Sequence, residues 1–141
     1  MERRRTGDDL EIYAGKTRSF EWFWDARGEM PGLDAFEGLD EDGRDAVIAT
    51  LEHWGDLELG KHVSTTRVNQ EHSDPKILAI KADSHRFATF HAGENTWIVC
   101  HYYKKQKNKL DKLGKAAIRR TIAAKKDYEE RVSLGEYYER G

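Results

Sequence analysis

The chain has 141 residues, of which 35% are charged and 38% hydrophobic, and its net charge is −2 at pH 7. This length predicts one domain with a core of moderate size. No run of residues reaches the length of a membrane span, and the N-terminus lacks the apolar core of a signal peptide. We therefore expect a cytoplasmic protein that makes no use of a membrane. The single cysteine, Cys100, excludes an intramolecular disulfide and any multi-cysteine metal site.

The small net charge hides an asymmetry between the two parts of the chain. Residues 1–60 carry 16 Asp/Glu against 7 Lys/Arg, whereas residues 61–141 carry 10 against 17. A basic half is typical of proteins that bind a polyanion such as nucleic acid, but two opposite halves also neutralise each other within a fold. On charge alone both interpretations stay open.

The first 60 residues predict a loose segment, one strand and two helical stretches. Residues 1–16 are charged and form the loose segment, in which Glu11–Tyr13 is a candidate strand. Residues 17–25 predict a strand, and Leu33–Leu39 a short helical turn. Asp40 is a candidate N-cap for a helix that ends near Gly55. One face of the strand carries Phe20, Trp22 and Trp24, and the apolar stripe of the helix carries Val47, Ile48, Leu51 and Trp54.

Residues 77–107 are the stretch around which the rest of the chain is expected to pack. They read as three strands, and only Asp83–Ser84 lies between the first two. A two-residue turn there pairs Lys81 with Arg86 on one face of the sheet. Two like charges directly across a strand pair are destabilising, so a sheet that keeps them either solvates them or offers them an anion.

The second turn, residues 92–95, leaves the register of the third strand open. A turn at Gly93–Glu94 places Arg86 opposite His101, and a turn at Glu94–Asn95 places it opposite Tyr103. Both keep the odd-numbered residues of this strand on the Arg86 face, whereas a three-residue turn sends them to the other face. The two-residue alternatives predict Trp97, Val99, His101 and Tyr103 on the Arg86 face. They predict Leu78, Ile80, Phe87, Ile98 and Cys100 on the opposite face.

The remaining pattern is a helix and a short tail. Residues 57–70 have no assignable pattern, and Asp74–Pro75 marks a boundary before the strands. Residues 115–132 predict a closing helix, and residues 133–141 form a tail. The order of elements predicts an α+β fold in which helices cover one face of a mostly antiparallel sheet.

The predicted face with Lys81, Arg86, His101 and Tyr103 suits metal-free RNA cleavage. That reaction requires a deprotonated ribose 2′-hydroxyl, stabilised phosphorane charge and a protonated leaving 5′-oxygen. Lys81 and Arg86 suit the second task, and His101 or Tyr103 the acid–base work. The alternative is a polar, partly exposed sheet face without catalytic function.

The lysine-rich stretch after the third strand is a second candidate for RNA contact. It carries Lys104, Lys105, Lys107 and Lys109 in the expected RNA-binding set, next to Tyr102, on whose ring a base would stack. The alternative is a solvated loop. The histidines have no metal-ligand spacing, and Cys100 lies within an apolar strand, so we expect no metal, no cofactor and no cysteine nucleophile.

Four stretches carry a resemblance to a known family. They are FEWFWDARGEMPGLDAFEGL, AVIATLEHW, KILAIKADSHRFATFHAGENTWIVCHYYKKQKNK and AAIRRTIAAKKDYEERV. Together they resemble the RelE/ParE superfamily of bacterial toxins, in particular its phage-derived HigB-like branch. The resemblance covers residues 17–132, which we take as the toxin domain. Arg86 matches the strand arginine of the family, and Lys104–Lys105 match its double lysine.

The resemblance implies the toxin of a type II toxin–antitoxin system. Such a protein inhibits translation by cutting mRNA on the ribosome, and a cognate antitoxin holds it in check. Two alternatives share the fold: a ParE-like, non-enzymatic inhibitor of gyrase, and a phage-derived binding protein without the chemistry. The roles of Lys81, His101 and Tyr103 come from the shared face and not from the resemblance.

Overall fold

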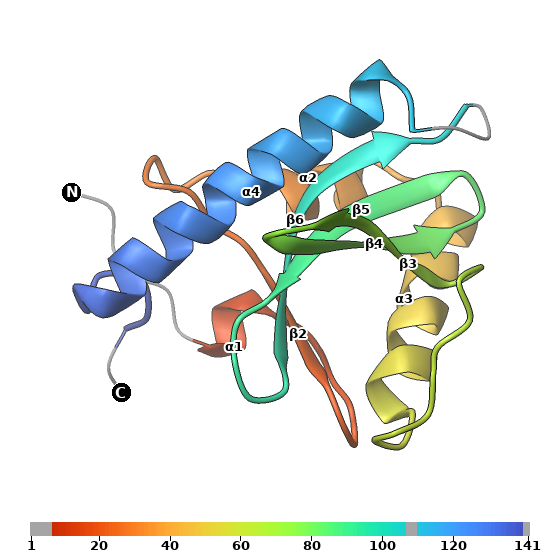
Figure 1. Cartoon of the computed structure of the whole chain (residues 1–141), viewed down its shortest axis with the longest axis horizontal. Helices are drawn as coiled ribbons and strands as arrows, with labels where there is room; N and C mark the ends of the chain where they lie inside the picture. The colour runs from red at the N-terminus through yellow and green to blue at the C-terminus, as the bar shows by residue number, and fades with distance from the viewer. Residues whose placement is uncertain (1–6, 107–109, 140–141) are drawn as a thin grey trace.

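Six strands form one mixed sheet in the order β1-β2-β6-β5-β4-β3 (Figure 1). The structure is a computed structural model and describes residues 7–106 and 110–139. Its strands are β1 (Glu11–Ala14), β2 (Ser19–Trp22), β3 (Val68–Ser73), β4 (Lys76–Ala82), β5 (His85–His91) and β6 (Thr96–Lys104). Its helices are α1 (Gly7–Leu10), α2 (Pro31–Glu37), α3 (Glu41–Asp56) and α4 (Lys112–Ser133). The expected α+β fold with a mostly antiparallel sheet is confirmed, and the parallel pair is β2 with β6.

The first hairpin has the predicted register. β4 and β5 pair Lys81 with Arg86 and Ile80 with Phe87, and the two residues of the turn are Asp83 and Ser84. Asp83 has a φ of 54°, a left-handed conformation that aspartate tolerates better than most residues. Lys81 and Arg86 are therefore direct cross-strand neighbours, as the sequence predicts.

The second hairpin combines a three-residue turn with the Arg86–Tyr103 pairing that a two-residue turn at Glu94–Asn95 would give. Its turn has three residues, 93–95, because Ala92 N–H donates to the carbonyl of Thr96. A register shift then separates the Ala88–His101 pair from the Thr89–Val99 pair, so β6 carries one extra residue there. Beyond the shift Arg86 faces Tyr103, as it would with a turn at Glu94–Asn95.

The bulge corrects the predicted faces of the residues nearer the turn. Val99 lies in a cluster with Phe87, while Ile98 and Cys100 lie in another cluster with Ala88. The prediction that Val99 and Trp97 share the Arg86 face is therefore wrong, as is the placement of Ile98 and Cys100 on the opposite face. A single extra residue inverts the alternation of side chains, and no residue type in β6 signals it.

Helices cover both faces of the sheet, which differs from the expected cover on one face. Alternate residues of the same strands divide between two buried clusters, as the neighbours Ile77 and Leu78 show. The first cluster includes α4 through Ile118 and Tyr128, and the second includes α3 through Leu51. Figure 1 shows α4 and α3 on different sides of the central strands. The apolar stripes of the two helices thus serve different faces.

Both long helices begin at a capping aspartate. Asp40 accepts the N–H of Gly43 at 2.7 Å at the start of α3, as predicted, and Asp111 accepts the N–H of Gly114 at 3.0 Å at the start of α4. The expected closing helix is confirmed, but it begins at Lys112, three residues before the predicted start. This earlier start brings the first turn of α4 over the end of β6.

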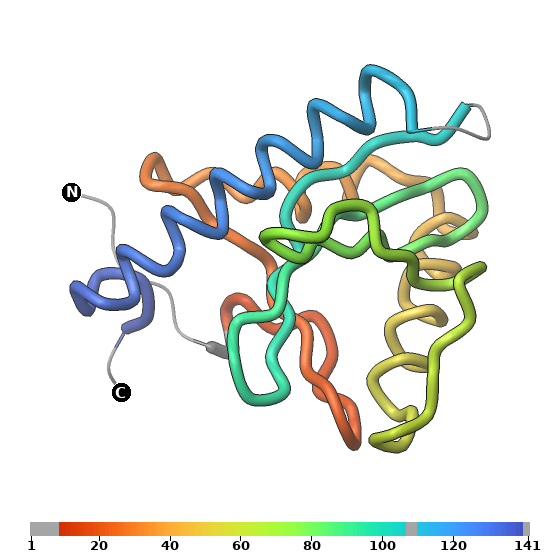
Figure 2. The backbone as a smooth tube through the Cα atoms, viewed as in Figure 1, coloured from red at the N-terminus to blue at the C-terminus, as the bar shows by residue number. Residues whose placement is uncertain are grey.

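The candidate strand at Glu11–Tyr13 is confirmed as β1, which pairs with β2. Two other segments are more ordered than the sequence suggested. β3 begins within the stretch that had no assignable pattern, and it pairs with β4. The connection from α3 to β3 runs back beside α3 (Figure 2). In the tail, Tyr137 is fully buried. The predicted strand at residues 17–25 ends at Trp22, so Trp24 packs in the α4 cluster and not beside Phe20.

Among the described residues, no helix combines the length and the apolar character that crossing a membrane requires.

Candidate functional site

A row of three side chains crosses the sheet at one end of β4, β5 and β6. Lys81 pairs with Arg86, and Arg86 pairs with Tyr103 on its other side. Directly opposed residues of antiparallel strands have Cβ atoms roughly 4.5–5.5 Å apart, so the three side chains are neighbours. The structure thus brings together three of the four residues that the sequence proposed for catalysis. We refer to them as the Lys81–Arg86–Tyr103 row.

Arg86 is the buried centre of this row, with 9% of its surface exposed. Its Nη1 donates to the carbonyl oxygens of Asp83 at 2.7 Å and His85 at 2.9 Å, both at the β4–β5 turn. The turn therefore fixes the position of the guanidinium before any ligand binds. A fixed, partly desolvated cation is the arrangement that stabilises developing negative charge most effectively.

Lys81 lies in an electropositive environment. Its Nζ donates to the carbonyl of Thr65 at 2.8 Å. Burial lowers the pKa of Lys81 from its ordinary value of 10.5, and the nearby charges of Arg86 and Lys105 lower it further, while Glu71 acts in the opposite direction. Lys105 is held at the same end because its N–H donates to the carbonyl of Ser84 at 2.8 Å. Lys81 therefore has two further cations nearby, and an anion would stabilise such a site.

Tyr103 closes the row on the side of α4. Its side chain is buried, and its ring lies so close to Gly114 that a Cβ at that position would come within 3.1 Å of the ring. Burial raises the pKa of Tyr103 well above its ordinary value, the carboxylates of Glu71 and Asp111 raise it further, and Arg86 acts to lower it. The phenol is therefore protonated at neutral pH and can donate a hydrogen bond.

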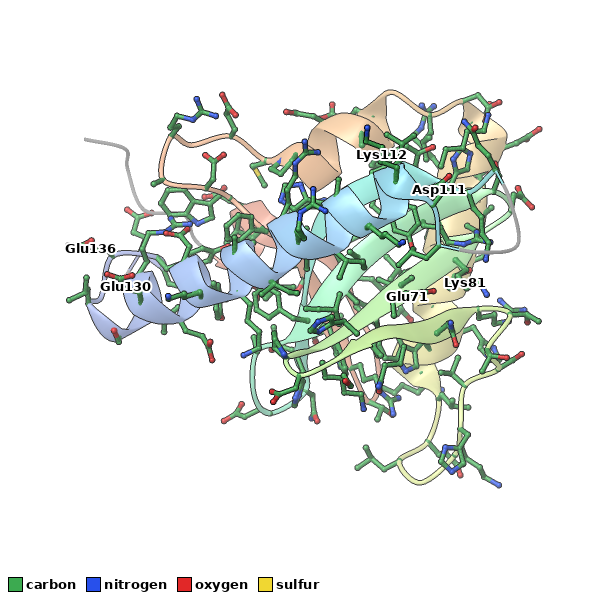
Figure 3. The ribbon with its side chains drawn as sticks, turned by 45° about the horizontal axis from the view of Figure 1, so that its top comes forward. Glu71, Lys81, Asp111, Lys112, Glu130 and Glu136 are labelled. Atoms are coloured by element: carbon green, nitrogen blue, oxygen red, sulfur yellow. The ribbon has the colours of Figure 1, made fainter. Side chains whose placement is uncertain are left out.

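Glu71 and Asp111 are acidic neighbours of the row that the sequence analysis missed. Glu71 lies on β3 at a register shift in its pairing with β4, and its Oε1 accepts from Asn69 Nδ2 at 3.1 Å. Figure 3 shows Glu71 and Lys81 on neighbouring strands, with Asp111 at the start of α4. A strand at residues 68–73 was not recognisable from periodicity, so nothing in the sequence placed Glu71 beside Lys81.

His101 does not belong to this row, although the sequence grouped it there. It faces a hollow of about 360 Å³ lined by Asp25 and Arg120 among others. Burial lowers the pKa of His101, and the charge of Arg120 lowers it further, while Asp25 acts in the opposite direction. Its electrostatic partners therefore come from the β2–α2 connection and from α4, not from Lys81 or Arg86.

The residues proposed for RNA binding are divided between several places. Tyr102 lies on the opposite face from Tyr103, where its hydroxyl is 2.7 Å from Nδ1 of His85 and its ring packs against Phe87. Burial raises the pKa of Tyr102. Lys104 is exposed at the end of β6, and Lys105 follows it beside the row. Lys107 and Lys109 lie outside the described residues.

No cluster of three or more metal-ligating side chains occurs within residues 7–106 and 110–139. Cys100 is fully buried, and burial raises the pKa of its thiol, so this sulfur is a poor nucleophile. Cations, a phenol and two carboxylates therefore meet at the Lys81–Arg86–Tyr103 row, and these groups suit chemistry on a phosphate.

No protein-family model matches this chain, and no curated protein matches it.

Proposed function

We propose that this protein is a metal-independent endoribonuclease of the RelE/ParE type, a toxin that cuts mRNA on the ribosome in the cytoplasm and is neutralised by a cognate antitoxin. The observation that supports this proposal best is the fixed guanidinium of Arg86 between Lys81 and Tyr103. Such a row offers two positive charges and one proton to a single phosphate. Phosphate contacts of this kind supply a large, sequence-independent part of the affinity of proteins for nucleic acids.

In the proposed reaction the ribose 2′-oxygen attacks the adjacent phosphorus. A bond forms between this oxygen and phosphorus, the bond from phosphorus to the 5′-oxygen breaks, and the products are a 2′,3′-cyclic phosphate and a 5′-hydroxyl. Arg86 stabilises the charge on the phosphorane, because its position is set by the β4–β5 turn and requires no rearrangement. Lys81 and Lys105 neutralise the phosphate in the ground state as well and hold the backbone.

The proton transfers are assigned to Glu71 and Tyr103. The Glu71 carboxylate accepts the proton of the 2′-hydroxyl, and the Tyr103 phenol donates a proton to the leaving 5′-oxygen. A raised pKa makes Tyr103 a weak acid. An alkoxide is nevertheless a stronger base than a phenolate, so this transfer is favourable once the bond breaks. We place no proton transfer on His101, since its neighbours are Asp25 and Arg120.

RNA binding beyond the scissile phosphate is assigned to the end of β6. Lys104 is exposed there, and Lys107 and Lys109 of the sequence prediction stay in the proposal as backbone contacts. We no longer propose that a base stacks on Tyr102, because its ring packs against Phe87 and its hydroxyl lies within hydrogen-bond distance of His85.

A cell-free translation reaction with one reporter mRNA tests the proposal. New 5′ ends are mapped with the wild-type protein, with Arg86→Ala and without added protein, on translated message and on message whose start codon is removed. We expect in-frame cuts on translated message only. We expect these cuts to be lost in Arg86→Ala, while circular dichroism shows that the variant retains its fold. Cuts that persist at full rate in Arg86→Ala would refute the assignment of Arg86.

A non-enzymatic inhibitor on the same fold gives a different result in the same experiment. It would leave the mRNA intact, and supercoiling by gyrase would then be measured with and without the protein. Intact mRNA together with normal protein synthesis would contradict the nuclease proposal altogether.

A further inference from the structure

The outer side of α4 carries cations at helical spacing. Lys112, Lys115, Arg119 and Lys126 are all exposed, and their intervals of three, four and seven residues place them on one stripe of the helix. With a rise of 1.5 Å per residue, the stripe extends over roughly 21 Å. Exposed cations alone mark only a solvated helix face, so a second feature is needed to indicate a partner.

That second feature is an apolar groove between α4 and the β3–β4 turn. The groove has a volume of about 480 Å³, and its apolar lining comes from Pro75, Ile122 and Ala123. Arg119, Lys125 and Lys126 form its rim together with Glu129, which pairs with Lys125 at 3.0 Å. We call this feature the α4 groove. Neither the Lys81–Arg86–Tyr103 row nor Glu71 lines it.

We propose that the α4 groove is a docking site for an acidic amphipathic segment of another protein. Charge complementarity supports this occupant, because the pairing of Glu129 with Lys125 leaves the rim with the positive charges of Arg119 and Lys126. An apolar lining with a basic rim fits a helix or extended segment whose apolar side chains enter the groove and whose carboxylates meet the rim. The stems of the rim lysines add apolar surface to the contact.

The lining distinguishes this occupant from RNA. Single-stranded RNA is held by base stacking on aromatic rings together with backbone contacts. No aromatic residue lines the groove in the part of the chain that the structure describes, and its apolar surface is aliphatic. An aliphatic groove contributes most when leucine, isoleucine or methionine side chains leave water to enter it.

The proposal is independent of the nuclease activity, since the groove shares no lining residue with the row. It is tested with a fluorescent synthetic peptide that has leucines at i, i+3, i+4 and i+7 and glutamates at the flanking positions. A second peptide has serine in place of every leucine, and a single-stranded oligouridine is the third probe. Binding to the full chain is measured by fluorescence anisotropy at physiological ionic strength.

Three variants separate the groove from general electrostatics. Ala123→Glu places a carboxylate at the exposed Ala123 position inside the groove, and Ala123→Gln adds the same bulk without charge. Lys115→Glu reverses a charge on the same stripe outside the groove. Both positions, Lys115 and Ala123, are exposed and helical, so the three variants are expected to fold, which circular dichroism and thermal unfolding verify.

We expect the leucine peptide to bind saturably, and the serine peptide to bind at least about tenfold more weakly. Ala123→Glu should lower the affinity for the leucine peptide by about tenfold or more, and Ala123→Gln should lower it by about threefold. Lys115→Glu should change this affinity by less than about twofold. Equal binding of both peptides, or equal effects of Ala123→Glu and Lys115→Glu, would overturn the proposal. So would the absence of saturable binding. Oligouridine that binds more tightly than the leucine peptide would assign the stripe to RNA instead.

Discussion

Two buried arginines occupy opposite kinds of environment in this protein. Arg86 is 9% exposed and Arg131 is 8% exposed. The guanidinium of Arg131 lies 4.5 Å from the ring centre of Trp24 and 4.7 Å from that of Tyr137, and it forms an ion pair with Asp127 at 2.8 Å. It also donates to the backbone carbonyl of Trp24. Aromatic faces and a carboxylate therefore compensate the charge of Arg131 within the fold.

Arg86 is compensated differently. Its hydrogen bonds reach two backbone carbonyls, and its charge contributes to lowering the pKa of Lys81 beside it. A buried cation held by neutral acceptors and next to another cation retains much of its attraction for an anion. The comparison teaches that burial alone does not distinguish a structural arginine from a binding one. The charges around the guanidinium distinguish the two arginines, and they predict opposite consequences for the same substitution at the two sites.

The largest expected effect is on activity, in Arg86→Met. Loss of the fixed cation should lower the rate of the proposed mRNA cleavage by about 100- to 1,000-fold. The free energy of unfolding should fall by only about 1 kcal/mol, because the carbonyls of Asp83 and His85 belong to a turn that water can reach. Primer extension on translated message measures the first quantity and urea denaturation the second. A stability loss equal to that of Arg131→Met would erase the proposed difference between the sites.

Arg131→Met is expected to have the reverse profile. Removal of the guanidinium leaves Asp127 without its partner and opens a space between Trp24 and Tyr137, so the free energy of unfolding should fall by about 3 kcal/mol. Cleavage per folded molecule should remain within about twofold of wild type, since small changes are the rule for residues remote from a site. Urea denaturation and activity normalised to the folded fraction measure the two. A large loss of normalised activity would show that Arg131 acts on the site.

The sequence predicted the Arg86 side of this comparison better than the Arg131 side. The Lys81–Arg86 pair follows from a two-residue turn and strand alternation, both of which are local. The Arg131 environment joins α4 to Trp24 and Tyr137, residues that are far apart in the sequence and whose elements no local pattern relates. The sequence analysis treated residues 133–141 only as a short tail and missed the burial of Tyr137, because Tyr137 packs against Trp24, which is distant in the sequence.

Within the site, prediction failed for the charged groups that other elements bring to it. Face parity placed His101 beside Arg86, and pairing in the structure does put the two on neighbouring positions of one face. Parity does not tell which charged groups approach from other elements. Arg120 and Asp25 come from α4 and the β2–α2 connection, and Glu71 comes from a strand without a sequence signature. Long-range packing, not local pattern, decides which titratable groups meet.

A smaller effect is expected from Tyr137→Phe, which removes only a hydroxyl from the Arg131 environment. The Tyr137 hydroxyl accepts the N–H of Trp24 at 3.2 Å, so the substitution removes this buried hydrogen bond. The aromatic face beside Arg131 stays in place. The free energy of unfolding should fall by about 1 kcal/mol, measured by urea denaturation, with cleavage unchanged. A loss as large as that of Arg131→Met would mean that the hydroxyl, and not the ring, stabilises this region.

The smallest expected effect is a change in the pKa of Lys81, and it tests the electrostatic side of the comparison directly. Burial is the main cause that lowers the pKa of Lys81 from 10.5, and Arg86 is the second. Arg86→Met should therefore raise the pKa of Lys81, while Arg131→Met should leave it unchanged. Titration of the lysine side-chain signals by nuclear magnetic resonance measures both variants. An unchanged pKa in Arg86→Met would show that the two cations are independent.

The direction of this shift also fixes its effect on stability. A pKa lowered in the folded state means that the unfolded chain binds the proton more tightly, so the contribution of Lys81 to stability is present above pH 10.5 and is lost as the pH falls. At neutral pH the charged row therefore opposes folding to a small extent. A bound phosphate reverses that balance, because it favours the charged form of Lys81. A short oligonucleotide with a non-cleavable 2′-deoxy linkage should raise the pKa of Lys81 in the wild-type protein and do so less in Arg86→Met.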